Sequence, residues 1–185
     1  MFSLSATFVQ VESPDTRSLL ERARAGDGAA FGELCRHCEA GLIRQAMTLC
    51  GNETLAEDLA QDTLVEAWRG LRRYEGRCQF FTWLCAILLN RFRNARRQQR
   101  PPPPEEPSAE PQDAPDQQLL HGERAALMRK CIAALPPKHR QVIFLRFYVD
   151  DSLPEIAAAL GCSVGTVKSR LFHALDKLRR MNLNA

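Results

Sequence analysis

Apolar positions along this chain recur mostly at intervals of three and four, and sustained alternation of apolar and polar residues is absent. Intervals of three and four match the 3.6-residue turn of an α-helix, whereas alternation would indicate a strand. The pattern therefore predicts an all-α fold. It places helices near residues 17–25, 29–50, 53–71 and 80–99, and again near residues 119–134, 139–148, 153–160 and 164–181.

A segment without large apolar residues separates the two sets of helices. Residues 101–116 contain seven of the eleven prolines and five acidic residues. Proline lacks the N–H group that a helix interior needs, so we expect this segment to be an extended tether. The sequence thus predicts two small helical domains, at 17–100 and 119–185, joined by a flexible proline-rich and acidic linker at 101–118 and preceded by a tail at 1–16.

The last two expected helices have the features of a helix-turn-helix. Ser152 and Glu155 have capping-box spacing, Gly161 can end the first helix, and Ser163 can cap the second. The apolar stripe of the second helix is Val167, Leu171, Ala174, Leu175 and Leu178. Its outward residues are Lys168, Ser169, Phe172, His173 and Lys177. Such a helix can enter a DNA major groove, and the alternative is a surface hairpin with solvated charges.

The distribution of charge agrees with DNA as the partner. The net charge is only +3, but residues 117–185 carry 11 basic against 5 acidic groups. A locally basic module indicates a polyanionic partner. No apolar run approaches the roughly 18 residues that span a membrane, and the N-terminus lacks the pattern of a signal peptide. We therefore expect a cytoplasmic protein without membrane insertion.

The helix expected at 53–71 carries a mixed polar face beside its buried stripe. The stripe is Leu55, Leu59, Leu64, Ala67 and Trp68. The neighbouring face is Asp58, Gln61, Asp62 and Val65. Asp and Gln accept hydrogen bonds from Arg and Lys while an aliphatic residue packs, so this face suits a basic partner helix. The alternative is a solvated acidic face.

The helix expected at 80–99 begins aromatic and ends rich in arginine. Its polar stripe is Thr82, Ala86, Asn90, Arg93 and Arg97. The arginines can neutralise phosphates, and Asn90 can contact a base or a phosphate. The preceding loop, from Tyr74 to Gln79, combines a glycine and an aromatic ring with Arg77, which suits it to hold an unstacked base. The alternative is that the aromatic residues after this loop belong to the core, and for Trp83 we expect the core.

The chain has seven cysteines, and we expect a reducing cytoplasm to keep them mostly as thiols. Cys35 and Cys38 have C-x-x-C spacing, which with His37 makes at most half of a zinc or redox-sensing site. They fall on a helix with an apolar stripe, so packing is the favoured interpretation. The sequence contains no metal-ligand quartet, phosphate loop or nucleophile and base pair, so we expect no cofactor, no metal and no catalytic residue.

Three segments, in this order, resemble an extracytoplasmic-function (ECF) sigma factor of the sigma-70 family, the smallest class of bacterial transcription initiation factors. EDLAQDTLVEAW is similar to the family's clamp-binding helix, FFTWLCAILLNRFRNARR to its promoter-melting helix, and LPEIAAALGCSVGTVKSRLFHALDKLR to its C-terminal reader. The resemblance covers nearly the whole chain. It implies an RNA polymerase sigma factor, with domain two at 17–100 and domain four at 119–185, that starts transcription of stress- or signal-responsive genes.

The resemblance also implies partners and site residues. Core RNA polymerase would be bound, through the clamp helices of its largest subunit, by Asp58, Gln61, Asp62 and Val65. The minus-ten element of promoter DNA would be bound by Tyr74, Arg77, Gln79, Asn90, Arg93 and Arg97. The minus-thirty-five element would be bound by Thr166, Lys168, Ser169, Arg170, Phe172, His173 and Lys177. An anti-sigma factor would cover the polymerase-binding surfaces.

Two positions depart from the family pattern. His173 lies where arginine is common, and Asn94 lies where aspartate is common. Histidine cannot copy the bidentate pairing of an arginine fork with guanine, so the first departure can change which base is read. The competing interpretation is a stand-alone helix-turn-helix regulator that does not bind polymerase. Such a regulator has no need of an acidic docking face or of an aromatic helix that ends in arginines.

Overall fold

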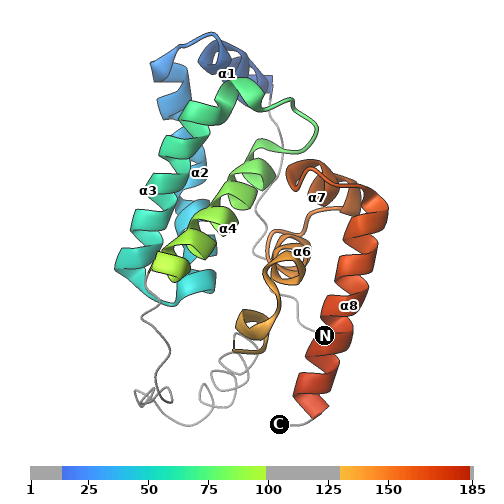
Figure 1. Cartoon of the computed structure of the whole chain (residues 1–185). Coiled ribbons are helices and arrows are strands. Elements are labelled where there is room, and N and C mark those ends of the chain that lie inside the picture. The colour runs from blue at the N-terminus through green and yellow to red at the C-terminus, as the bar shows by residue number, and fades with distance from the viewer. Residues whose placement is uncertain (1–13, 99–129, 184–185) are drawn as a thin grey trace.

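The computed structural model describes residues 14–98 and 130–183, and the regular structure in these two ranges is helical (Figure 1). The first range contains α1 (Pro14–Arg24), α2 (Gly28–Cys50), α3 (Glu53–Gly70), the short 3-10 helix η1 (Leu71–Arg73) and α4 (Phe80–Gln98). The second contains α6 (Pro137–Phe147), α7 (Leu153–Ala159) and α8 (Val164–Leu183), after a helical stretch at 130–134. The expected linker, most of the expected tail and the start of the helix at 119–134 lie outside the described residues.

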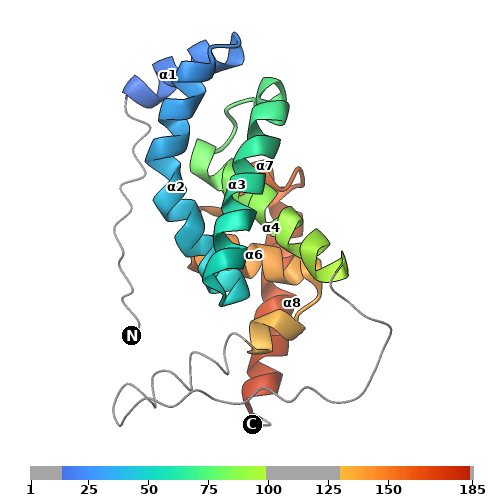
Figure 2. The ribbon, with the colours of Figure 1, turned by 90° about the vertical axis from the view of Figure 1, so that its left-hand side faces the viewer.

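Local capping fixes where the first helices begin and end. The Asp27 carboxylate accepts hydrogen bonds from the N–H groups of Ala29 and Ala30, both at 3.0 Å, at the start of α2. Gly51 ends α2 with a φ of 67° and donates to the carbonyl of Met47. Asn52 then caps α3 by accepting from Leu55 N–H at 2.9 Å. These two adjacent residues make a tight turn, so α2 and α3 pack as antiparallel neighbours (Figure 2).

The first domain buries the apolar stripes of α1 to α4 against one another. Fully buried members of this core include Leu34, Leu42, Ala56, Leu84 and Leu88. The expectation that Trp68 is buried is wrong, because its side chain is 40% exposed. Its ring lies against Phe31 with the centroids 4.9 Å apart, at the edge of the core.

The second domain forms the expected helix-turn-helix. Ser152 and Glu155 make the predicted capping box, with Ser152 N–H donating to the Glu155 carboxylate at 3.0 Å. Gly161 has a φ of 61°, and Ser163 Oγ accepts from Thr166 N–H at 3.1 Å at the start of α8. The buried stripe of α8 includes Val167 and Ala174 as expected, but the expectation for Leu175 is wrong, since 44% of it is exposed.

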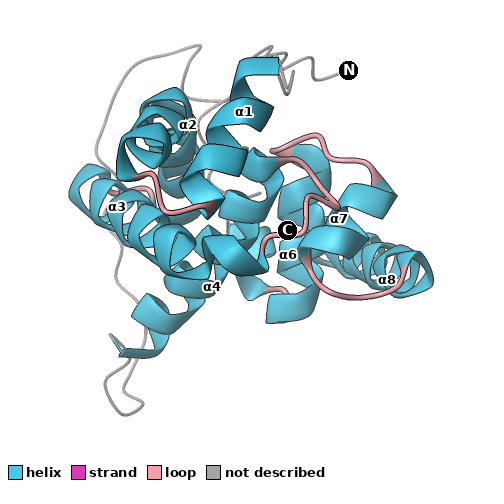
Figure 3. Cartoon of the chain, turned by 90° about the horizontal axis from the view of Figure 1, so that it is seen from above, coloured by secondary structure: helices cyan, strands magenta, loops and turns pink. Residues whose placement is uncertain are grey.

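The two domains share a core, which the sequence did not predict. Cys85 and Leu89 of α4 pack with Val142 and Leu145 of α6 and with Ile156 of α7. Figures 1 and 3 show α4 lying beside α6 and α7. The α4 helix therefore belongs to both domains in this structure.

Three hydrogen bonds accompany this shared core. Thr82 Oγ1 donates to Asp151 Oδ1 at 2.6 Å. Gln45 Nε2 donates to the carbonyl of Tyr148 at 3.1 Å, and Gln141 Nε2 donates to Asn90 Oδ1 at 3.3 Å. The described conformation is thus closed, with the helix-turn-helix domain packed on α4. Among the described helices, none has the length and apolar character of a membrane span.

Candidate polymerase and promoter interfaces

The α3 helix presents the predicted acidic face to solvent. Asp58, Gln61 and Asp62 are exposed, and Val65 is 49% exposed although it is apolar. Trp68, one turn beyond Val65, extends this apolar strip and was missed by the sequence analysis, which placed it in the core. The spacing of three from Val65 to Trp68 was the signal that could have found it. An exposed Trp is typical of protein-binding surfaces, in which this residue is enriched.

Part of the acidic face is already paired inside the chain. Arg91 of α4 donates from Nη2 to Asp62 at 2.6 Å and from Nη1 to Glu66 at 3.2 Å. The hydrogen bond to Asp62 raises the pKa of Arg91. Exposed ion pairs contribute only about 0.2–1 kcal/mol, so an arginine of a partner protein can replace Arg91 at little cost.

The loop before α4 does not offer the aromatic surface that was expected. Tyr74 is buried, its hydroxyl donates to the carbonyl of Cys78 at 2.5 Å, and its ring packs on Trp83 with the centroids 5.1 Å apart. In this conformation the Tyr74 ring is not available to stack on a base, and its assignment to the minus-ten element stays a prediction. The ring holds the loop against the core, because its apolar face packs on Trp83 while its hydroxyl bonds to the backbone of the loop.

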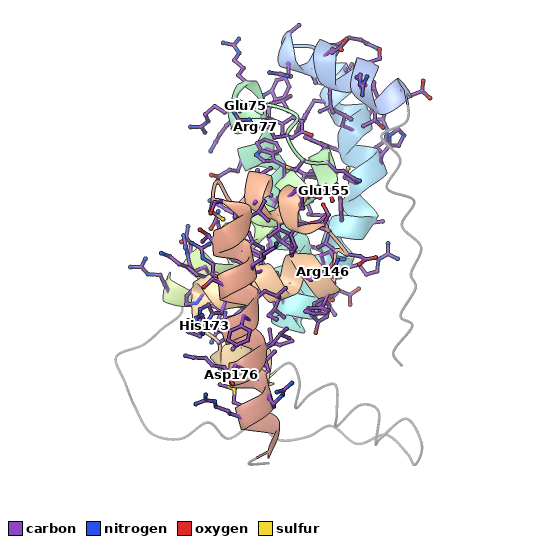
Figure 4. The ribbon with its side chains drawn as sticks, turned by 90° about the vertical axis from the view of Figure 1, so that its right-hand side faces the viewer. Glu75, Arg77, Arg146, Glu155, His173 and Asp176 are labelled. Atoms are coloured by element: carbon purple, nitrogen blue, oxygen red, sulfur yellow. The ribbon has the colours of Figure 1, made fainter. Side chains whose placement is uncertain are left out.

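The rest of this loop is more open. Gly76 has a φ of 71°, which makes a sharp turn, and the exposed Arg77 side chain pairs with Glu75 at 2.6 Å. Figure 4 shows Glu75 and Arg77 at one end of the molecule, far from His173. Gln79 is half-buried, and its carbonyl accepts from Trp83 N–H at 3.1 Å. Arg77 is thus an exposed basic residue of this loop that can reach a partner.

The polar stripe of α4 is divided by the second domain. Thr82 is 0% exposed and Ala86 is buried, whereas Asn90, Arg93 and Arg97 are exposed. Asn90 accepts a hydrogen bond from Gln141 of α6. The arginine-rich C-terminal end of α4 can contact DNA in this conformation, but the N-terminal half of the stripe, at Thr82 and Ala86, cannot.

Asp151, in the turn between α6 and α7, accepts a hydrogen bond from Thr82 in the buried half of α4, and no pattern in the sequence singled it out. The side chain is fully buried, and Oδ2 has no hydrogen-bond partner among the described residues. Burial raises the pKa of Asp151 to about 6, against the opposing effect of the hydrogen bond from Thr82. Arg146 donates to the backbone carbonyl of Asp151 rather than to its carboxylate, at 3.0 Å. A carboxyl group with a raised pKa therefore lies between the domains.

The α8 helix exposes most of the residues predicted to read DNA. These exposed residues are Lys168, Ser169, Phe172, His173 and Lys177. Phe172 is 70% exposed, which is unusual for so large an apolar ring. Arg170 is half-buried with Nη1 at 3.9 Å from Cys162 Sγ, and Thr166 Oγ1 lies 2.9 Å from Ser163 Oγ at the helix start. Five of the seven predicted residues thus form one free surface, and two lie at its edge.

His139 of α6 also contacts this surface, and the sequence analysis missed it. Its ring stacks on that of His173, with the centroids 6.3 Å apart. The two residues lie on helices separated by the whole of α7, so no periodic pattern connects them.

The cysteine pair of α2 has the features of packing residues. Cys35 and Cys38 are half-buried free thiols packed against the core of the first domain. Burial raises the pKa of Cys38 to about 12 and also raises that of Cys35, so both stay protonated near neutral pH. No cluster of three or more possible metal ligands is found among the described residues.

Comparison with known proteins identifies both domains. Residues 34–101 match the family model for sigma-70 region 2, and residues 125–178 match that for sigma-70, region 4. The chain is 33% identical over 159 residues to the ECF RNA polymerase sigma factor RpoE of Cereibacter sphaeroides, covering 83% of this chain and 87% of that protein. It is 28% identical over 175 residues to the RNA polymerase sigma-H factor of Pseudomonas aeruginosa, covering 88% and 91%.

Solved structures agree with these relatives over most of the chain. The chain is similar to CnrH, solved in complex with the cytosolic domain of CnrY, with a TM-score of 0.64 and 31% identity over 90% of this chain and 96% of that one. It is also similar to the sigma factor RpoE of Bartonella quintana, solved with the anti-sigma factor NepR, with a TM-score of 0.57 and 26% identity over 82% and 95%. With its two matched regions in order and relatives of this kind across most of its length, the chain belongs to the sigma-70 family, as an ECF RNA polymerase sigma factor.

Proposed function

We propose that this sigma factor binds core RNA polymerase through α3 and promoter DNA through α4 and α8. The observation that carries the proposal is the presence of three separate exposed surfaces on these helices, which differ in charge. The α3 surface is acidic and apolar, whereas the end of α4 and the outer face of α8 are basic. An acidic surface repels DNA and suits a basic protein helix, so the surfaces divide the partners between them.

The polymerase surface consists of Asp58, Gln61, Asp62 and Val65, to which we add Trp68. The clamp helices of the largest polymerase subunit are the partner that the family implies. The exposed Trp68 ring and the Val65 side chain supply apolar area, and the acids set the orientation.

The promoter surfaces are used in succession. In the closed conformation α8 is free, while Thr82 and Ala86 of α4 are covered by the second domain. We infer that the closed form does not hold melted minus-ten DNA, and that the domains separate when polymerase binds. Arg77, Gln79, Asn90, Arg93 and Arg97 then line the minus-ten surface, and the exposed residues of α8, with Arg170 and Thr166 at their edge, face the minus-thirty-five element.

An anti-sigma protein is the regulatory partner that this proposal includes. The Bartonella RpoE was solved with the anti-sigma factor NepR, and CnrH was solved with the cytosolic domain of CnrY. Both sigma factors resemble this chain across most of its length. The protein would act in the cytoplasm, where RNA polymerase is, by binding and without catalysis. Recovery of the chain from unstressed cells free of any tight inhibitor would contradict this part.

The proposal is tested by comparing DNA binding by the free chain and by the holoenzyme. The free chain is expected to bind promoter duplex weakly and with little preference, whereas the complex with core polymerase binds it tightly and opens the minus-ten region, measured by permanganate reactivity of thymines. A chain that binds a specific duplex tightly without polymerase, and no polymerase in pull-down, would instead be a stand-alone regulator.

A further inference from the structure

Two histidines from different helices lie side by side at the reading surface of α8. His139 is in the first turn of α6 and His173 is in the middle of α8. Their ring centroids are 6.3 Å apart and their planes differ by 22°, which is a stacked arrangement. Phe172 contacts the His173 ring edge-on at 5.6 Å. Figure 4 shows His173 on the outside of α8. His173 therefore has a ring neighbour on each of two helices.

The surroundings of His139 favour a neutral ring. The residue is half-buried, and its Nδ1 atom is buried without a hydrogen-bond partner among the described residues. Burial lowers the pKa of His139, and the positive charges of Lys177 and Arg170 on α8, together with His173, lower it further. A neutral ring can stack on His173 without repelling it, whether or not His173 carries a proton.

An exposed side chain on a reader helix normally samples several rotamers, and binding has to select one of them. Base readout needs a donor or acceptor that points in a defined direction at a base edge. A ring that rests on a fixed neighbour already has its orientation before DNA arrives. His139 is such a neighbour, because it lies in the first turn of α6, where its N–H donates to the carbonyl of Pro136 at 2.9 Å.

We infer that His139 positions the ring of His173, and that the two histidines act as one specificity determinant for the upstream promoter element. The inference rests on the proposed function, in which α8 reads that element. It assigns a role in promoter choice to a residue outside the helix-turn-helix. The competing explanation is that His139 only fills space between α6 and α8.

Holoenzyme formed with core polymerase is used to select duplexes from a library that is randomised across the upstream element, and the selected pools are sequenced. The variants are His173→Ala, His139→Phe, His139→Leu and the double variant His139→Leu/His173→Ala. Phenylalanine keeps a flat ring for stacking, whereas leucine fills similar space without one. Thermal denaturation of each variant establishes that it is folded.

His173→Ala is expected to lower discrimination at one or two base positions by about fivefold or more. His139→Leu should lower it at the same positions, and His139→Phe should keep the wild-type preference. The double variant should lose no more than His173→Ala alone, because the two residues act through one contact.

If His173→Ala loses the base preference but folded His139→Leu protein keeps it, the inference about His139 is overturned and the proposed function of α8 stands. Loss at different base positions would overturn it too. His139→Gln, which is polar but has no ring, gives the same test if His139→Leu does not fold. If neither His173→Ala nor Lys168→Ala changes DNA binding, α8 is not the reader, and the proposed function fails first.

Discussion

The proposed polymerase surface on α3 can be tested one side chain at a time. Asp58 makes no ion pair within the described residues, whereas Asp62 is held by Arg91. Both lie off the buried stripe, so changing them alters the surface charge without removing core contacts. The free carboxylate of Asp58 is thus the more sensitive probe of polymerase binding.

Asp58→Arg is expected to weaken binding to core polymerase about tenfold or more, because it places a positive charge against a basic partner helix. Binding is measured by titrating labelled chain with core polymerase. Glu21→Arg makes the same charge change on the exposed surface of α1 and should bind as the wild type does. Equal binding by folded Asp58→Arg protein would remove α3 from the interface.

Lys168→Ala tests whether α8 contacts the DNA backbone. If the ammonium group neutralises one phosphate, the variant should bind all DNA sequences more weakly, with a salt dependence shallower by about one unit of slope. The measurement is the affinity of holoenzyme for promoter and unrelated duplexes between low and moderate salt. A loss confined to the promoter sequence would make Lys168 a base contact instead.

At the scale of the residue, exposure could be predicted for most polar positions but not for every aromatic one. The polar residues of α3 and α8 are exposed because helical periodicity separates them from the apolar stripe. Trp68 was expected in the core and is exposed, whereas Tyr74 was expected at a binding surface and is buried in this conformation, since an aromatic ring suits either place. Only the packing partners Trp83 and Phe31 decide between these outcomes.

At the scale of the element, helix ends follow from local chemistry and were predicted well. The capping box at Ser152 and the glycine turn at Gly161 act over a few residues, so the sequence alone contains what determines them. The start of α1 was misplaced by three residues, at 17 in place of Pro14, because proline is favoured in a first turn and lengthens the helix beyond the apolar pattern.

Gly161→Ala tests the turn between α7 and α8. A Cβ at this position meets nothing within 4 Å, so the cost comes from the positive φ alone and should be about 1 kcal/mol of unfolding free energy. Gly165→Ala is the matched control, because Gly165 is in the first turn of α8 with a negative φ, and the change should leave stability equal or higher. Chemical denaturation of both variants provides the comparison, and equal destabilisation would contradict this account of the turn.

At the scale of the whole molecule, the two regions were predictable and their contact was not. Each domain has its own periodic stripes, but Thr82 and Asp151 are 69 residues apart and share no motif. The polar stripe of α4 was expected to face DNA. Part of it is covered because Ala86 and Thr82 offer a small-residue surface against which α6 and α7 pack.

The raised pKa of Asp151 makes the closed form dependent on pH. In the open form the carboxyl group is expected near its usual value of 3.8, and in the closed form it titrates at about 6. The closed form therefore holds the proton more tightly, is most stable relative to the open form below the usual carboxyl pKa of 3.8, and loses this stability as the pH rises from there to about 6. The radius of gyration from small-angle X-ray scattering should increase between about pH 4 and about pH 7.

Asp151→Asn should remove this pH dependence, because the amide does not titrate. Asp150→Asn is the control, since Asp150 is an exposed neighbour whose loss should leave the pH dependence in place. An Asp151→Asn protein that still expands with rising pH would show that other groups control the opening.

The most direct test of the central claim is transcription by the purified chain and core polymerase on genomic DNA of the organism that encodes it, with transcript 5′ ends mapped by sequencing. The account predicts discrete start sites, absent with core polymerase alone, that share two upstream elements at a fixed spacing, and it predicts that Asp58→Arg abolishes them. Transcription no different from that of core polymerase alone, by a chain that still binds DNA, would contradict the claim.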